Sequence, residues 1–260
     1  MTPFIMENAI RKALDTKGYA IGCQLRTRSP MTAEIFGLSG FDYVFIENEH
    51  FIYDIETVEN VVRACQLTQT FPLLRLPDID EAKVKQHLDM GVQGLVFPHV
   101  DTPEEARSIV RYGKYYPAGE RGFSNSSRAC MYGQLSMDEY RRLANEKTWL
   151  MPMIESKEGV ENARAIIRSG CDAINVGPRD LSESYGFFGE LEHPEVQDGI
   201  DTVLRLCEET GIPAAGPAAT PQEAAAMLKR GFRMITYSSD TAMLLNASRT
   251  ALREIDRLMG

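Results

Sequence analysis

The feature that most constrains the fold is a short unit, a glycine followed within a few residues by an apolar stretch, that occurs four times. The four units begin at Gly40, Gly91, Gly170 and Gly231 and run to residues 47, 98, 177 and 238. Glycine suits the left-handed position just after a helix, where a Cβ atom is unfavourable. The following stretch is mostly apolar rather than alternating, which is typical of a parallel strand buried on both faces. The unit therefore predicts repeated helix-to-strand connections.

A pattern typical of helix starts occurs twice, at Thr102-Pro103 and at Thr220-Pro221. In each case threonine suits the N-cap, proline the first helical position, and a glutamate follows three residues after the threonine. Helical patterns include Val58–Leu67, Glu81–Met90, Pro103–Tyr112 and Val160–Ser169. Between them the sequence predicts eight strands, near residues 20–24, 43–47, 72–75, 93–97, 150–154, 172–176, 212–215 and 233–237. Eight strands alternating with helices predict an α/β fold, a closed (β/α)8 TIM barrel in which residues 1–260 form a single domain.

One segment interrupts this rhythm. Residues 113–149 exceed an ordinary connection and begin near the Gly- and Ser-rich stretch 117–127. A long irregular segment in a compact domain is usually functional or mobile. Because it lies between the fourth and fifth strands, we expect part of it to be able to reach the carboxyl end of the barrel.

Composition and charge narrow the partners and the compartment. The formal net charge of −9 and the lack of a basic block argue against nucleic acid as a partner. No stretch is apolar enough to cross a bilayer, and residues 1–8 lack the features of an export signal, so no membrane association is expected. The five cysteines form no Cys-x-x-Cys pair, which favours buried reduced thiols and a cytoplasmic location.

Polar residues gather where the predicted strands end. In a barrel these carboxyl ends converge on one mouth, where charged residues are better candidates for function than for packing. The residues concerned are Glu47, Asn48, Glu49 and His50 after the second strand, Arg75 at the third, Glu155 at the fifth and the segment 177–182 after the sixth.

Glu155 and Asp180 are the natural pair for a hard divalent cation, because carboxylate oxygens suit Mg²⁺ or Mn²⁺. The spacing is equally compatible with two carboxylates that pair with arginines or cap helices. His50 is open to two interpretations, a hydrogen-bonded structural residue or, beside a metal, a group that moves a proton near neutral pH. Arg75 is either a partner for Glu47 or Glu49, or a fixed cation that stabilises an enolate or alkoxide oxygen.

Other chemistries find little support. The chain has no Walker loop, no G-x-G-x-x-G motif and no G-x-S-x-G elbow, so no organic cofactor is expected. A Schiff-base aldolase needs a lysine at a strand end, whereas the lysines fall in helical or connecting segments.

At these residues the sequence resembles the HpcH/HpaI aldolase family, the class II pyruvate aldolases, from about residue 18 to 250. The segments that carry the resemblance are Gly40-Phe-Asp-Tyr-Val-Phe-Ile-Glu-Asn-Glu-His50, Leu74-Arg75-Leu76-Pro77, Pro117-Ala-Gly-Glu-Arg-Gly122, Ile154-Glu155 and Gly177-Pro-Arg-Asp-Leu-Ser182.

The resemblance implies a role for each matching residue. Glu155 and Asp180 correspond to the ligands of a divalent metal (Mg²⁺, Mn²⁺ or Co²⁺), and His50 to the base that works with water bound to it. Arg75 corresponds to the residue that stabilises charge on the keto oxygen, and Asp89 to an aspartate supplied by a neighbouring subunit. The segment Gly177, Pro178, Arg179 and Asp180 corresponds to the place that receives the substrate carboxylate on backbone amides, as at a helix start. The resemblance also implies a homohexamer that exchanges C-terminal helices, with which the amphipathic Leu244–Leu258 is compatible.

Three positions depart from the family pattern. Glu47, implied as support for His50, replaces a common aspartate, and Met153 replaces a frequent glutamine two residues before the metal glutamate. Arg179 stands where a small alanine is usual. We expect the segments Phe123–Arg128 and Gly216–Ala218 to influence which aldehyde is accepted.

The reaction implied by the resemblance is the reversible cleavage of a 4-hydroxy-2-oxo acid to pyruvate and an aldehyde, through a pyruvate enolate held on the metal. The same enolate chemistry serves two alternatives, decarboxylation of oxaloacetate and cleavage of a CoA ester. A third alternative is a non-catalytic protein that binds 2-oxo acids, which the replacements at Glu47 and Met153 would favour.

Overall fold

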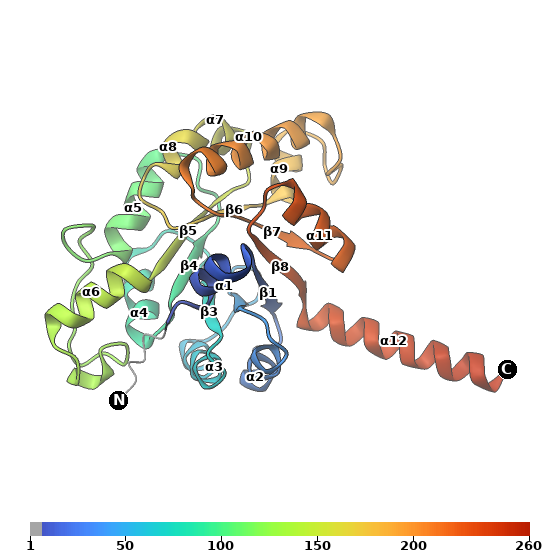
Figure 1. The fold of residues 1–260 in the computed structure, drawn as a ribbon, viewed down its shortest axis with the longest axis horizontal. Helices are drawn as coiled ribbons and strands as arrows, with labels where there is room; N and C mark the ends of the chain where they lie inside the picture. The colour runs from blue at the N-terminus through green and yellow to red at the C-terminus, as the bar shows by residue number, and fades with distance from the viewer. Residues whose placement is uncertain (1–6) are drawn as a thin grey trace.

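The computed structural model describes residues 7–260, which form a closed barrel of eight parallel strands in sequence order (Figure 1). Each strand pairs with the next along the chain, and the first pairs with the last. The strands are β1 (Ala20–Leu25), β2 (Tyr43–Glu47), β3 (Phe71–Arg75), β4 (Gly94–Phe97), β5 (Trp149–Ile154), β6 (Ile174–Val176), β7 (Ala214–Ala218) and β8 (Met234–Ser239).

Helices surround this barrel, and α12 extends away from it (Figure 1). They are α1 (Ala9–Lys17), α2 (Pro30–Leu38), α3 (Ile55–Leu67), α4 (Glu81–Met90), α5 (Pro103–Gly113), the 3₁₀ turn η1 (Met131–Gly133), α6 (Met137–Lys147), α7 (Lys157–Glu161), α8 (Ala163–Ile167), α9 (Pro178–Ser184), α10 (Pro194–Thr210), α11 (Pro221–Arg230) and α12 (Asp240–Met259). None of the helices in the described part of the chain is both long and apolar enough to cross a membrane. Residues 1–6, on which the expected lack of an export signal partly rests, lie outside the described residues.

The prediction of a single (β/α)8 barrel is confirmed, and all eight predicted strands are present with shifts of a few residues at their ends. The helix starts also behave as predicted. Thr102 and Glu105 form a reciprocal capping box, and Thr220 accepts the N–H of Glu223. One predicted helix was wrong in detail, because Val160–Ser169 is divided between α7 and α8 at Asn162. The Asn162 side chain donates to the carbonyl oxygen of Asp101, which holds this junction in place.

Segment 113–149 differs from the expectation in both structure and position. It contains η1 and α6, so it is only partly irregular. Because α5 runs back from the carboxyl end of β4, the segment begins and ends at the amino end of the barrel. The Ala129 N–H donates to the Asp89 carbonyl oxygen in α4, and Lys114 at the start of the segment donates to the Thr148 carbonyl oxygen at its end. Within one chain it therefore does not reach the mouth.

The barrel separates two apolar cores, because alternate residues of a strand face opposite sides. Phe45, Leu73 and Met153 belong to the core inside the barrel. Their sequence neighbours, such as Ile46 and Leu74, belong to the core between the strands and the helices. This alternation decides which polar side chains at the strand ends point into the mouth.

Candidate active site at the barrel mouth

The side chains at the mouth follow directly from the alternation of the strands. Glu47 and Arg75 lie two residues after Phe45 and Leu73, and Glu155 lies two residues after Met153, so all three continue the inward-facing rows. Glu47 and Arg75 are also direct partners in the pairing of β2 with β3. The inward-facing position at or just after the end of each of these strands is therefore charged, and the three side chains converge on the mouth.

Arg75 is held between two glutamates. Its Nη2 donates to Glu47 Oε2, and its Nη1 lies 2.9 Å from Glu49 Oε2. The other oxygen of Glu47 accepts the backbone N–H groups of Glu49 at 2.9 Å and His50 at 3.2 Å. Burial acts to raise the pKa of Glu47, but the charge and hydrogen bond of Arg75 and the two N–H groups outweigh it, so this pKa lies below its ordinary value. Glu47 therefore remains an anion that orients Arg75.

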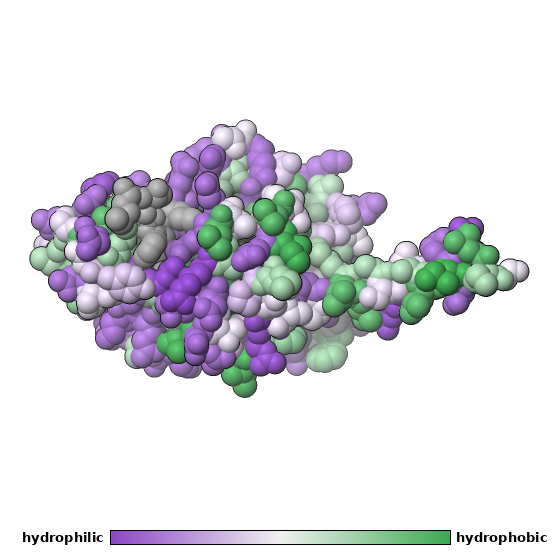
Figure 2. Space-filling model, turned by 90° about the horizontal axis from the view of Figure 1, so that it is seen from below, coloured by the Kyte–Doolittle hydropathy of each residue, from purple (hydrophilic) through white to green (hydrophobic). Residues whose placement is uncertain are grey.

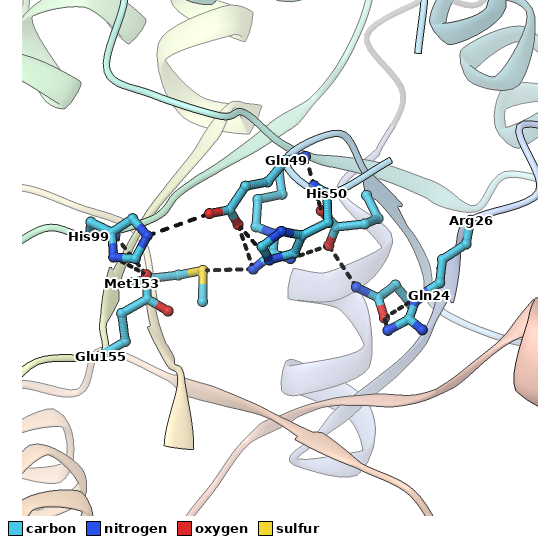
Figure 3. Close-up of polar contacts among 9 residues, drawn as sticks. Gln24, Arg26, Glu49, His50, His99, Met153 and Glu155 are labelled. Carbon is cyan, nitrogen blue, oxygen red and sulfur yellow. Dashed lines mark hydrogen bonds and ion pairs between the residues drawn. The ribbon is translucent and has the colours of Figure 1, made fainter. Parts of the chain in front are cut away.

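His50 lies beside this pair and remains open to solvent. Its Nε2 is 3.7 Å from Glu49 Oε2, and 66% of its side chain is exposed. Glu47 thus supports His50 through the backbone N–H of that residue, while its neighbour Glu49 approaches the imidazole ring (Figure 3).

Glu155 and His99 occupy the other side of the mouth (Figure 3). Glu155 Oε1 accepts the His99 N–H at 2.7 Å and lies 3.3 Å from His99 Nδ1, while His99 Nε2 lies 3.5 Å from Glu49 Oε1. His99 thus links the two glutamates. Burial raises the pKa of Glu155 to about 7, against the His99 N–H and charge, and the negative charges of Asp180 and Glu49 add to the rise.

Asp180 lies in the first turn of α9, which begins beside Glu155. Gly177 caps this helix and Pro178 takes its first position. An alanine Cβ at Gly177 would lie 2.4 Å from Glu155 Oε2, so the backbone of this turn packs directly against the carboxylate. Asp180 and Arg179 are exposed. The first N–H groups of a helix have no partner within it, so this turn presents donors to an anion.

Glu155 and Asp180 together fit a hard divalent cation. Both offer carboxylate oxygens, and the charge of Asp180 disfavours the ionised form of Glu155, a repulsion that a cation would relieve. Among residues 7–260 no group of three or more histidine, cysteine or acidic side chains is arranged to hold a metal ion. A Mg²⁺ site in which two carboxylates are completed by water and substrate is compatible with that arrangement.

Asp89 is the one predicted site residue that lies elsewhere. It sits near the end of α4, at the amino end of the barrel, where its carboxylate pairs with the buried Arg121. Within one chain it therefore cannot meet His50. This position is compatible with the expectation that it acts on a neighbouring subunit.

Four residues of the mouth were not among the predicted site residues. His99 follows β4 and adopts a left-handed backbone with φ of 52°, an unusual conformation for a residue other than glycine. The signal available for it was its place after a strand, in Phe97-Pro98-His99. Gln24 and Arg26 lie at and just beyond the end of β1, and the same rule of strand ends would have found them. Met153, at a departure from the family pattern, is buried with its sulfur 3.8 Å from Arg75 Nη1.

A cavity of about 890 Å³ lies at the amino end of the barrel and is lined by residues that include Arg11, Trp149, Asp172 and Arg233. It contains none of the predicted site residues. The charged mouth rather than this cavity combines a buried carboxylate of raised pKa, a fixed guanidinium and an open imidazole, so we assign the chemistry to the mouth.

Comparison with known proteins shows the family to which the chain belongs. Residues 20–247 match the model of the HpcH/HpaI aldolase/citrate lyase family. The hydroxypyruvate/pyruvate aldolase of Roseobacter denitrificans is 34% identical over 94% of this chain and 95% of its own length. A 5-keto-4-deoxy-D-glucarate aldolase of an Enterobacter species is 33% identical over 95% of this chain and 96% of its own.

Among solved structures, an HpcH/HpaI aldolase/citrate lyase family protein from Burkholderia cenocepacia superposes with a TM-score of 0.90. It is 31% identical in sequence, over 96% of this chain and 100% of that one. The family match spans nearly the whole barrel, including every residue placed at the mouth. The chain therefore belongs to the HpcH/HpaI aldolase/citrate lyase family and is an enzyme, a carbon–carbon lyase of the aldolase type.

Proposed function

We propose that this enzyme reversibly cleaves a 4-hydroxy-2-oxo acid to pyruvate and an aldehyde, with the help of a divalent metal. The observation that carries the proposal is the convergence of Glu155, Arg75 and His50 on one mouth. The printed names of two relatives, a hydroxypyruvate/pyruvate aldolase and a 5-keto-4-deoxy-D-glucarate aldolase, support this type of substrate.

Each side chain has a defined task in the cleavage direction. His50 takes the proton of the C4 hydroxyl as the bond between C3 and C4 breaks and the aldehyde forms. The electron pair of that bond becomes the enolate of pyruvate, and Arg75 stabilises the negative charge on its oxygen. A proton then adds at C3 and completes pyruvate.

Glu155 and Asp180 would hold Mg²⁺, Mn²⁺ or Co²⁺, which when bound supplies Lewis-acid polarisation of the keto oxygen. Gly177, Pro178, Arg179 and Asp180 would receive the substrate carboxylate on the first N–H groups of α9. The Glu47–Arg75 ion pair keeps the guanidinium from turning away, so the cation is oriented before substrate arrives.

Asp89 would complete the site of a neighbouring copy, so we also propose a homo-oligomer, a hexamer that exchanges α12 between subunits. In the described residues Asp89 is fixed by Arg121, which would present it as a rigid group. All five cysteines are buried and free, which supports a cytoplasmic location.

The test is exchange of the pyruvate methyl protons in D₂O, followed by NMR in metal-stripped protein before and after Mg²⁺, Mn²⁺ or Co²⁺ is added. We expect metal-dependent exchange that falls by at least ~100-fold in Arg75→Ala, Glu155→Ala and Asp180→Ala. Asp15→Ala removes an exposed carboxylate on α1, at the amino end of the barrel, and should exchange like the wild type.

Full activity in Glu155→Ala or Asp180→Ala would contradict the metal assignment. A wild-type protein that exchanges no pyruvate protons with any of the metals would contradict the pyruvate-enolate proposal. That result would favour a CoA-ester lyase or a non-catalytic protein that binds 2-oxo acids. Exchange combined with faster turnover of oxaloacetate than of hydroxy-oxo acids would favour the decarboxylase.

A further inference from the structure

Arg75, the cation proposed to stabilise the enolate, already has its charge balanced by two carboxylates. Its Nη2 donates to Glu47, and its Nη1 lies 2.9 Å from Glu49 Oε2. One guanidinium between two carboxylates leaves the three groups with a net negative charge, and such a group attracts a new anion only weakly. The oxygen of an enolate would therefore be better stabilised if a further positive charge acted on the same group.

Arg26 places such a charge just beyond the end of β1. Ala20 lies in the core inside the barrel, whereas Cys23 and Leu25 face the helices, so Gln24 and then Arg26 take the inward side of this strand. Both Gln24 and Arg26 are half-buried. The guanidinium of Arg26 is therefore a second positive charge at the mouth, on a strand that neighbours β2.

The guanidinium of Arg26 is held by neutral groups. Its Nε and Nη2 donate to Gln24 Oε1 at 3.0 and 2.6 Å, and its Cζ lies 5.3 Å from the centre of the Phe51 ring. The backbone is also held, because Asp240 accepts the N–H groups of Arg26 and Thr27. Among residues 7–260 no carboxylate forms an ion pair with Arg26, so its charge is not balanced by a direct partner.

The Gln24 amide connects this charge to the Arg75 pair. Its Nε2 donates at 2.7 Å to Glu47 Oε2, the same oxygen that accepts Arg75 Nη2. The amide is fixed in this orientation, because turning it over would set its N–H₂ group against a guanidinium and its oxygen against a carboxylate. The positive end of the amide dipole therefore faces Glu47, and its negative end faces Arg26.

We propose that Gln24 and Arg26 are positioning residues for enolate formation, which share the charge of Glu47 and so leave more of the charge of Arg75 to the enolate oxygen. This inference rests on the proposed enolate chemistry and concerns how positive charge is delivered to it. Figure 3 shows Gln24 and Arg26 on the side of the mouth opposite Glu155, beside which the proposed pyruvate lies. Arg26 therefore acts through Gln24 and Glu47, without touching pyruvate.

The first test is exchange of the pyruvate protons in D₂O without any aldehyde, in protein supplied with Mg²⁺, Mn²⁺ or Co²⁺. Arg26→Met and Gln24→Met should each lower kcat for exchange by about 5- to 30-fold and change KM for pyruvate by less than ~3-fold, because the lost charge matters most as the enolate forms. The double variant should be less than ~2-fold slower than the slower single variant, since both replacements break one connection. Arg26→Lys keeps the charge and should recover part of the rate.

Binding of oxalate gives a second readout, which does not depend on turnover. Oxalate is a planar dianion that resembles the pyruvate enolate, so calorimetry should show its Kd raised by about 5- to 30-fold in Arg26→Met and that of pyruvate by less than ~3-fold. Arg28→Gln is the matched control, because it removes the same charge two residues away, from an exposed arginine that donates to the Ile52 carbonyl oxygen. It should change the exchange rate and both Kd values by less than ~2-fold, since an exposed charge is screened.

Thermal unfolding followed by circular dichroism establishes that each variant is folded. If Gln24→Met is not, Gln24→Glu replaces it, because this variant keeps the native shape but sets a second carboxylate against Glu47, and wild-type exchange in it would overturn the inference. Additive losses in the double variant, or equal losses of oxalate and pyruvate affinity in Arg26→Met, would also overturn it. Wild-type exchange in both single variants overturns the inference alone, whereas failure of the wild type to exchange pyruvate protons with any metal overturns the proposed function as well.

Discussion

Glu47 shows how one buried carboxylate can organise a whole site. Both of its oxygens accept hydrogen bonds, Oε1 from two backbone N–H groups and Oε2 from Gln24 and Arg75. A carboxylate surrounded by donors is stable as an anion even when water is excluded. The glutamate side chain is long enough to accept from Gln24 and Arg75 together. Glu47 is therefore central both to stability and to the orientation of the mouth.

Glu47→Gln should destabilise the protein by about 3–5 kcal/mol at pH 7. The N–H₂ group of the new amide would face one of the donors that the carboxylate now accepts, and Arg75 would keep only Glu49 as an acidic partner. The folded pKa of Glu47 lies below 4.5, so the carboxylate contributes stability above that value. This contribution is lost as pH falls from 4.5 through the folded pKa. The difference between wild type and variant should therefore shrink in acid, as measured by urea unfolding at a series of pH values.

Glu47→Asp keeps the charge and should lose less stability than Glu47→Gln, and Glu208→Gln on the exposed face of α10 should lose almost none. A Glu47→Gln variant as stable as the wild type at pH 7 would show that the buried ion pair contributes little.

At the scale of single elements, the first turn of α9 is shaped by its contact with β5. Gly177 has φ of −102°, which any residue can adopt, so its lack of a side chain is a matter of space and not of backbone conformation. The missing Cβ allows the turn to approach the Glu155 carboxylate, and this approach sets where Asp180 stands relative to it. The geometry of the two candidate metal ligands thus depends on one glycine.

Gly177→Ala should shift the Glu155 side chain, because the new Cβ would lie 2.4 Å from its Oε2 and 2.7 Å from its Cβ. We expect a loss of about 1–3 kcal/mol of stability from overpacking, and a loss of metal-dependent pyruvate exchange. Gly122→Ala serves as the control for stability, because its Cβ would meet only the Lys85 side chain at 3.5 Å. Wild-type exchange in Gly177→Ala would show that the mouth tolerates a displaced Glu155.

At the scale of the whole molecule, α12 has no apolar surface of its own chain to cover it along most of its length. Figure 2 shows hydrophobic residues gathered on this protruding helix. They include Leu244, Leu245, Leu252, Ile255, Leu258 and Met259, all of which are exposed in the single chain. A contiguous exposed apolar face of this kind is typical of a surface that another protein covers. Together with the placement of Asp89, it supports assembly of several copies.

Replacing Leu252 and Ile255 by glutamate should therefore dissociate the assembly, because two charges would have to be buried at an apolar contact. We expect light scattering after size-exclusion chromatography to show a multiple of the 29.1 kDa chain for the wild type and a smaller species for the variant. Thr250→Glu, a single charge on a different face of α12, should leave the assembly intact. A wild type that elutes as a monomer would contradict the exchange of α12.

The architecture could be inferred from the sequence because it depends on local and repetitive signals. The glycine at a helix end and the unbroken apolar strand can be recognised within a few residues, and their repetition predicts the barrel. The same logic located Glu47, Arg75 and Glu155, since a charged residue at the end of a buried strand stands out against its apolar neighbours. The resemblance to the family added roles that spacing alone left open, as for Asp89.

Only the tertiary structure decided which of these residues meet and how they are held. His99 joins Glu155 through a left-handed backbone, and Arg26 joins Glu47 through an amide, although neither pair is close in sequence. Segment 113–149 was expected to be able to reach the mouth, and the direction of α5 places it at the opposite end. Sequence patterns report the period and burial of single elements, whereas contacts at the mouth arise from the closure of the barrel, which brings distant strand ends together.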